Sequence, residues 1–119
     1  MTDSRNDLRE MTITFALSVS DICDEIKGCR SYVDQIVRSS SSIGANLFEA
    51  GYAQSRADFI HQLEISLKEC SETLFWIDLL NRSEILSDRQ VAALRDDCLE
   101  LRKMLSSACK TLEERIHDK

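Results

Sequence analysis

The sequence predicts an all-α protein, an antiparallel up-down-up-down four-helix bundle, from three observations. The 119-residue chain has no proline and only three glycines, whereas folds rich in strands need frequent tight turns and the residues that make them. Apolar residues recur at three- and four-residue spacing along most of the chain, which lines one face of a helix. The breaks in this pattern are short, and short connections make neighbouring helices antiparallel.

The first helix is expected over residues 5–27, and the second over residues 30–54. Gly28 lies just after the first helix, where a left-handed helix cap favours glycine. The apolar face of the second helix is interrupted by three small residues, Ser40, Gly44 and Gly51. Small side chains at helical spacing let two backbones approach closely. We therefore expect these three residues to permit close packing inside the bundle.

The third and fourth helices are expected over residues 56–82 and 88–117, and each follows a capping sequence. Ser55 lies three residues before Asp58, so its hydroxyl can cap the third helix while the carboxylate sits in the positive first turn. The sequence Ser87-Asp88-Arg89-Gln90 has the pattern of a capping box. Apolar residues then alternate three and four apart up to Leu112 without a break. This regular stripe predicts the fourth helix most clearly.

Size and charge set limits on the class of protein. We expect one domain over residues 1–119, since a chain of this length can bury about two thirds of its unfolded surface. Fifteen basic and twenty-one acidic residues give a net charge of −6, so a phosphate backbone would on average be repelled. The charged beginning of the chain lacks an apolar run that could form a signal peptide or membrane span. We therefore expect a cytoplasmic protein with no membrane partner.

The two central helices each carry an outward stripe of polar residues. The second helix contributes Arg38, Ser42, Asn46 and Glu49, and the third contributes His61, Glu64, Lys68 and Glu72. Lys68 lies four residues from both Glu64 and Glu72, which is good spacing for ion pairs. The stripes could be solvated faces with weak ion pairs. They could also contact another subunit or a ligand.

A second set of apolar residues lies outside the expected core faces of these helices. Its members are Phe48, Tyr52, Ile65, Trp76, Leu79 and Leu80. A monomeric bundle has little use for so much additional apolar surface. Self-association is the simplest way to cover it, so these residues are candidates for an oligomer interface.

Metal and catalytic motifs are weak in this sequence. Residues 114–117 supply a single Glu-x-x-His, whereas a di-iron bundle needs this motif twice. Glu49 and His61 should lie near the same end of a helix pair, but both point away from the predicted core, which favours a surface ion pair over acid-base catalysis. We expect no catalytic site, no cofactor and no metal site.

The five cysteines, Cys23, Cys29, Cys70, Cys98 and Cys109, are odd in number and include no Cys-x-x-Cys pair. This pattern indicates neither a disulfide framework nor a zinc site. We therefore expect them to be buried free thiols.

Basic residues are dispersed among acidic ones, with Arg102-Lys103 the only adjacent pair. No aromatic stripe is interleaved with them, so the direct signal for nucleic-acid binding is weak. An oligomer could still gather Arg38, Arg56 or Lys110 from several subunits into one ring.

Two central segments resemble a known family. SSSIGANLFEA at residues 40–50 and SRADFIHQLEISLKECSETLFWIDLL at residues 55–80 resemble the bacterial four-helix bundle family, also called the 23S rRNA intervening-sequence protein family. In the first segment the matching residues are Ser42, Gly44, Asn46 and Glu49. In the second they are Asp58, Phe59, Lys68, Glu69, Glu72, Thr73 and Trp76.

The resemblance implies a four-helix bundle that assembles as a ring-shaped homopentamer and has no established enzymatic activity. One branch of the family resembles the accessory protein of diversity-generating retroelements, which is basic and works with reverse transcriptase and nucleic acid. This chain departs from that branch in its acidic charge. It departs also at Leu47-Phe48, where many members carry Ile-Ala.

The leading hypothesis is a non-catalytic homo-oligomeric bundle, expected to be a pentamer, that acts as a binding or scaffold module. The alternative is an accessory factor that binds RNA, DNA or a reverse transcriptase through a surface formed on oligomerisation.

Overall fold

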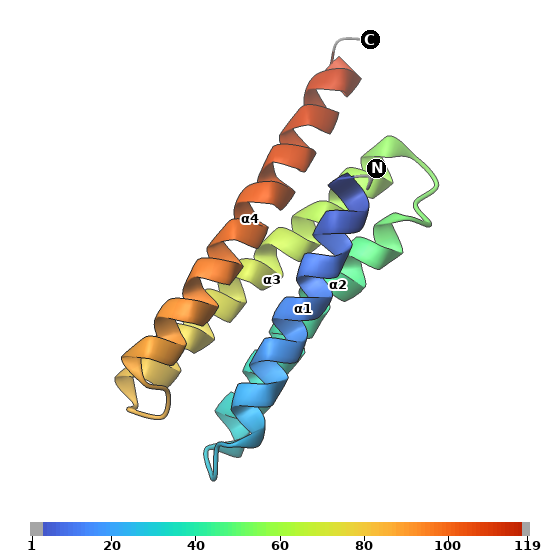
Figure 1. Ribbon diagram of the computed structural model, residues 1–119. Helices are drawn as coiled ribbons and strands as arrows, with labels where there is room; N and C mark the ends of the chain where they lie inside the picture. Colours follow the sequence, from blue (N-terminus) through green and yellow to red (C-terminus); the bar gives the residue numbers. More distant parts are fainter. Residues whose placement is uncertain (1–3, 118–119) are drawn as a thin grey trace.

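A computed structural model describes residues 4–117 of the chain and the side chains of residues 7–115. It contains four α-helices, α1 (Ser4–Asp24), α2 (Arg30–Ala50), α3 (Arg56–Arg82) and α4 (Asp88–His117) (Figure 1). Each helix packs against the next along the chain, and α4 also packs against α1, while in the described residues the backbones of the diagonal pairs, α1 with α3 and α2 with α4, do not approach within 8 Å. The predicted antiparallel four-helix bundle is confirmed.

The ends of α1 and α2 differ from the sequence prediction. The helix α1 ends at Asp24 rather than at residue 27, because the following amides bond to carbonyls three residues back, as in Ile26 N to Cys23 O at 3.0 Å. Gly28 adopts the expected left-handed conformation, with φ of +88°. Similarly, α2 ends at Ala50 rather than at residue 54, in short turns that include Tyr52 N to Glu49 O at 3.0 Å.

The bounds of α3 and α4 agree with the prediction, and both predicted caps form. The amide of Asp58 donates to Ser55 Oγ at 3.1 Å. The amide of Gln90 donates to Ser87 Oγ at 3.2 Å, and the Ser87 amide donates back to Gln90 Oε1 at 3.0 Å. Each cap satisfies backbone donors that the first turn of a helix leaves without partners.

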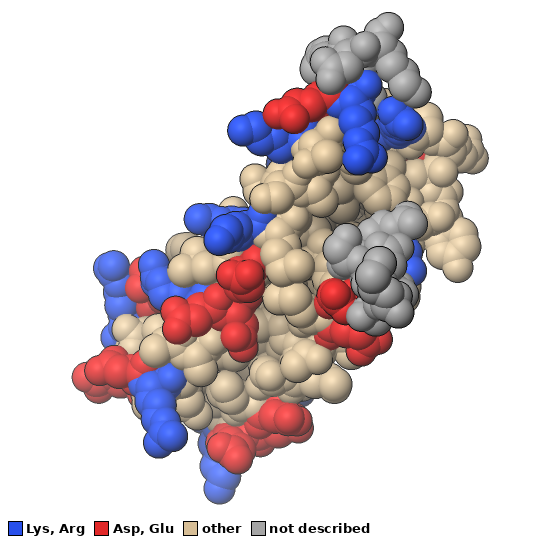
Figure 2. All heavy atoms as spheres, turned by 45° about the horizontal axis from the view of Figure 1, so that its top comes forward, with Lys and Arg blue, Asp and Glu red and all other residues tan. Residues whose placement is uncertain are grey.

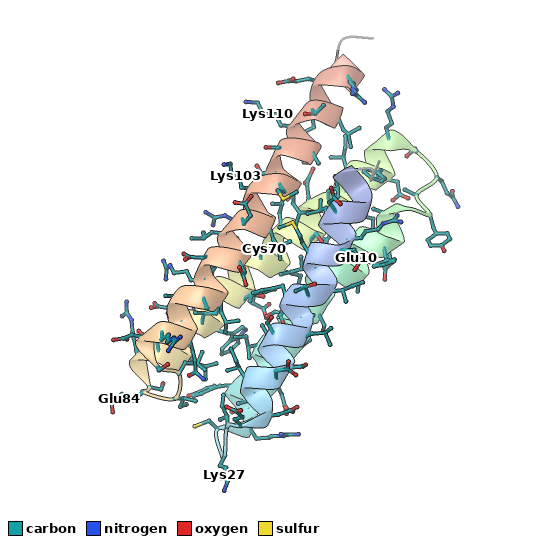
Figure 3. All side chains as sticks on the ribbon, in the orientation of Figure 1. Glu10, Lys27, Cys70, Glu84, Lys103 and Lys110 are labelled. Atoms are coloured by element: carbon teal, nitrogen blue, oxygen red, sulfur yellow. The ribbon has the colours of Figure 1, made fainter. Side chains whose placement is uncertain are left out.

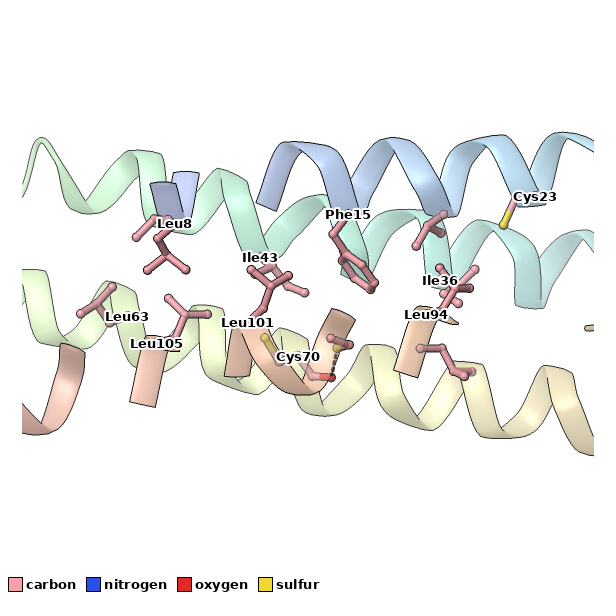
Figure 4. Close-up of a cluster of buried hydrophobic side chains, with 14 of the residues drawn as sticks. Leu8, Phe15, Cys23, Ile36, Ile43, Leu63, Cys70, Leu94, Leu101 and Leu105 are labelled. Carbon is pink, nitrogen blue, oxygen red and sulfur yellow. Dashed lines mark hydrogen bonds between the residues drawn. The ribbon is translucent and has the colours of Figure 1, made fainter. Parts of the chain in front are cut away.

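A continuous apolar core runs along the centre of the bundle (Figure 4). All four helices contribute to it, for example with Phe15 from α1, Ile43 from α2, Leu63 from α3 and Leu101 from α4. Burying each such side chain contributes about 1.5–3 kcal/mol to stability. None of the helices in the described residues is long and apolar enough to cross a membrane.

The helices α1 and α2 approach closely at Gly44. A Cβ atom on Gly44 would lie only 2.8 Å from Thr12 Oγ1. Thr12 is itself 1% exposed, and its hydroxyl donates to the carbonyl of Arg9. Ser40 is buried as expected, whereas Gly51 is exposed because it follows the end of α2. The packing prediction is therefore confirmed for Ser40 and Gly44 and is wrong for Gly51.

Buried hydroxyl groups connect α2 to α3. Thr73 Oγ1 lies 2.8 Å from Ser39 Oγ, and the two residues are fully buried. The Ser66 hydroxyl donates to the carbonyl of Ile43 across the same helix pair. Leaving a buried polar group unpaired costs about 1–3 kcal/mol. These contacts therefore favour one register of α3 against α2, and this register positions the polar stripes.

Candidate functional site: the outer face of α2 and α3

The polar stripe of α2 is organised by bonds within its own helix. Ser42 Oγ donates to the carbonyl of Arg38 at 2.8 Å, and Asn46 Nδ2 donates to the carbonyl of Ser42, also at 2.8 Å. Both side chains are partly exposed, and Glu49 is exposed. Ser42 and Asn46 therefore have intrahelical partners, which gives them a structural role beside any role in binding.

The stripe of α3 divides between two neighbours. Glu72 turns toward α2, where its carboxylate forms an ion pair with Arg38. Glu64 turns toward α4, where it lies near Cys109 and Glu113. His61 and Lys68 are exposed. Among the described residues, the predicted pairs of Lys68 with Glu64 and Glu72 do not form. Glu72 does not pair with Lys68 because its carboxylate is paired with Arg38 instead.

Arg38, which helical spacing places in the outward polar stripe of α2, is the central residue of this face, although its pairing with α3 was not predicted. Its guanidinium forms ion pairs with Glu72 and with Glu69, the latter at 3.4 Å, and Nε donates to Gln35 Oε1 at 3.1 Å. An arginine one turn before Ser42, opposite an acidic pair on the next helix, is the sequence signal that could have identified it.

An aromatic cluster continues this face toward the α3–α4 turn. Trp76 Nε1 donates to Glu72 Oε2 at 3.0 Å. The ring of Trp76 makes an edge contact with Phe75 at 4.9 Å between centroids, and the ring of Tyr32 lies 6.1 Å away. Tyr32 and Phe75 are 39% and 57% exposed. Trp, Tyr and Arg together are typical of residues that dominate binding energy at protein interfaces.

Five of the six apolar residues predicted for an interface reach the surface, and one does not. Phe48 and Tyr52 are exposed, and Ile65, Trp76 and Leu79 are partly exposed. Leu80 is completely buried, so its assignment to the surface is wrong. The amides of Ile85 and Leu86 both bond to the carbonyl of Leu80 as the chain turns toward α4, and Leu80 and Leu86 both belong to the buried core.

An exposed apolar groove lies between α1 and α2, on the other side of α2. Ile13, Leu17 and Phe48, which are 40–59% exposed, form its rim. Ala16, Gly44 and Ala45 line its floor, and its volume is about 200 Å³. Sequence reasoning missed Ile13 and Leu17, although their four-residue spacing beside the α1 core stripe is a usable signal.

One cluster of possible metal ligands lies at the seam of α3 and α4. Single ligand atoms of Glu64, Cys109 and Glu113 all lie within 4.8 Å of one another. Burial, followed by the charges of Glu113 and Glu64, raises the pKa of the Cys109 thiol to about 11. Because a thiolate is the form that binds metal, a thiol held protonated at neutral pH disfavours coordination. The absence of a metal site stays a prediction.

The cysteines are free thiols in the structure, as predicted, but not all are buried. Cys29 is exposed in the α1–α2 connection, where its φ of 50° places it in a tight turn. Cys70 and Cys98 lie side by side in the core, and the Cys98 thiol donates to the carbonyl of Cys70 at 3.5 Å. The prediction of burial is therefore wrong for Cys29, which lies outside the helices, and confirmed for the other four.

The suggested acid-base pair is not assembled. Glu49 and His61 are both exposed, and among the described residues no hydrogen bond or ion pair joins them. Acid-base chemistry needs the two groups within hydrogen-bonding reach of a substrate. The expectation that the protein is not an enzyme stays a prediction.

The fold and this polar face define a small helical bundle protein. Residues 5–107 match the family model described as 23S rRNA-intervening sequence protein, and the chain belongs to that family. A solved structure from Bacteroides thetaiotaomicron VPI-5482 is 37% identical, with a TM-score of 0.85, and the match covers 91% of this chain and 99% of that chain. That protein is described as one of unknown function from the S23 ribosomal protein family. A search of curated proteins gives no match.

Proposed function

We propose that this protein is a non-catalytic homo-oligomer, a pentameric ring, that serves as a binding or scaffold module. The observation that carries the proposal is the apolar groove between α1 and α2, whose rim leaves Ile13, Leu17 and Phe48 in solvent. Apolar residues gathered around one groove mark interaction sites more often than scattered ones do.

A closed ring requires two different surfaces on each subunit, because each subunit contacts its two neighbours in head-to-tail fashion. The α1–α2 groove supplies one surface that a neighbour can cover. The aromatic cluster of Tyr32, Phe75 and Trp76 supplies a second, on the α3 side of α2. Two separate surfaces on opposite sides of one helix favour a ring over a symmetric dimer, which uses one self-complementary patch.

Sedimentation velocity with a substituted groove tests this proposal. Phe48→Glu places a charge at the rim of the groove, and we expect it to shift the protein from oligomer to monomer. Ala93→Glu is the matched control, because Ala93 is exposed on α4 away from the groove. Equal sedimentation of the wild type and Phe48→Glu would exclude the groove from the interface.

A further inference from the structure

A second groove lies along the seam of α3 and α4, on the side of α4 that faces away from α1. Its volume is about 490 Å³, within the usual range for sites that bind small molecules. Leu67 and Leu99 provide apolar walls. The remaining lining residues are all cationic or hydroxylic, and they are Ser71, Arg102, Lys103, Ser106, Ser107 and Lys110.

Helical spacing brings the polar lining groups of α4 onto one side of that helix. Arg102, Ser106 and Lys110 are four residues apart, so they follow one another along successive turns over about 12 Å. Lys103 lies one position further around the helix, and in Figure 3 it projects to the same side as Lys110. The groove therefore has a serine hydroxyl between two cations, with a third cation at its edge.

The cations of this groove have no acidic partners in the described part of the chain. The ion pairs found there involve Arg30, Arg38 and Arg82, and none involves Arg102, Lys103 or Lys110. None of the lining residues is acidic. In a protein with a net charge of −6, whose basic and acidic side chains are interspersed (Figure 2), a groove lined by three cations and no acidic residue is a local exception.

The hydroxyl groups of the groove are also available. Each serine from Ser39 to Ser42 donates its hydroxyl to a carbonyl of its own helix. Among the hydrogen bonds of the described residues, no such bond occupies the hydroxyl of Ser71, Ser106 or Ser107. The groove thus offers both charged and neutral donors, and none of its lining residues carries a carboxylate.

We propose that this groove is a phosphate-binding site. Phosphate oxygens accept several hydrogen bonds and carry the charge that unpaired Arg and Lys side chains attract, and charge-assisted bonds of this kind are the strong ones. Arg102 and Lys110 bind phosphate groups at the two ends of the groove, and Ser106 donates between them. The inference goes beyond the proposed assembly and does not depend on it.

Two probes distinguish the possible sources of the phosphate. Inorganic tripolyphosphate represents a small phosphorylated ligand, and a fluorescently labelled single-stranded oligouridylate represents a nucleic acid. Binding of both to the full-length protein is measured at low and at physiological salt, by calorimetry for the first and by fluorescence anisotropy for the second. We expect tripolyphosphate to bind, with an affinity that falls as salt rises.

A pair of double variants links the binding to the groove. Arg102→Ala with Lys110→Ala removes two groove cations, and we expect at least about tenfold weaker binding, since each removed side chain makes charge-assisted bonds to phosphate. Arg89→Ala with Arg95→Ala removes the same charge from exposed positions of α4 outside the groove, and binding should be unchanged. Ser106→Asp, a single exposed change, should cause the same loss as the groove variant.

The possible binding results lead to different conclusions. Tripolyphosphate binding that depends on Arg102 and Lys110 supports the site and a small phosphate ligand. Oligouridylate binding with the same dependence supports the site and identifies a nucleic acid as the source. Absence of binding of both probes at low salt overturns the proposal. Equal weakening by the two double variants also overturns it, because binding would then follow net charge alone.

Discussion

Arg38 on α2 and Glu72 on α3 form an ion pair across the outer seam of the bundle, and the Trp76 indole donates to the same carboxylate. One acidic side chain thus connects the polar stripe of α2 with the aromatic cluster of α3. The pair is partly exposed, with 46% of the Arg38 side chain and 37% of the Glu72 side chain accessible. Exposed ion pairs contribute little to stability, about 1 kcal/mol at most, so its main effect is to orient Trp76.

Substitution of Glu72 should therefore change the environment of Trp76 more than it changes stability. Trp76 is the only tryptophan, so fluorescence emission reports on it alone. We expect Glu72→Ala to shift the emission maximum while the free energy of unfolding falls by about 1 kcal/mol or less. The control is Asp96→Ala, which removes an exposed carboxylate from α4. An unshifted emission spectrum in Glu72→Ala would contradict the geometry.

Gly44→Ala should destabilise the fold, although the same change usually stabilises a helix by about 1 kcal/mol. The new methyl group would lie 2.8 Å from Thr12 Oγ1, so α1 and α2 would have to separate. Overpacking of this kind costs about 1–3 kcal/mol, which urea unfolding can measure. Adding Thr12→Ala should restore part of the loss by removing the hydroxyl. A Gly44→Ala protein as stable as the wild type would show that the helices are not in close contact there.

The five thiols should differ sharply in reactivity. Cys29 is exposed, whereas Cys70 and Cys98 are 0% exposed, and Cys23 and Cys109 are 8% and 6% exposed. Burial also raises the pKa of the Cys23 thiol, and the Cys98 thiol together with burial raises that of Cys70. A thiol-specific chromogenic reagent at neutral pH should modify one cysteine quickly and the others only after unfolding. The fast phase should disappear in Cys29→Ser, and its persistence there would contradict the assignment.

Stability should fall at alkaline pH in part because of Cys109. The pKa of the Cys109 thiol is about 11 in the folded protein, whereas the ordinary pKa of a cysteine thiol is 9.0. A group whose pKa is raised by folding stabilises the folded protein fully at pH values below its pKa in the unfolded chain. This stabilisation is lost as the pH rises through its pKa in the folded protein. Between pH 9 and 11 the free energy of unfolding should therefore drop more in the wild type than in Cys109→Ala, by on the order of 1–2 kcal/mol. Parallel pH profiles of the two proteins would refute this.

The sequence predicts the helices α3 and α4 to the residue because their caps are local, with each cap residue bonding three positions along the chain. The ends of α1 and α2 are less predictable. Ile26 and Tyr52 continue the helical spacing beyond the true ends, while backbone turns terminate both helices earlier. The polar and apolar pattern alone contains no information about such turns.

Ser42, Asn46, Glu72 and Trp76 are partly exposed, as their helical spacing predicted, and their role as a functional site stays a prediction. The role of Arg38 could not be predicted because its choice of Glu72 over other acids depends on how α3 is rotated against α2. That rotation is favoured by buried contacts such as Thr73 with Ser39, which become visible only in three dimensions. Leu80 was misplaced for a similar reason, because its burial in the core depends on how the helices and the turn after α3 are arranged in space.

The mass of the native particle tests the proposed assembly most directly. Light scattering coupled to size exclusion at micromolar concentration measures it without reference to shape. We expect five times the chain mass of 13.6 kDa for the wild type and the mass of a single chain for Phe48→Glu. A wild-type mass equal to one chain would contradict the proposed pentamer.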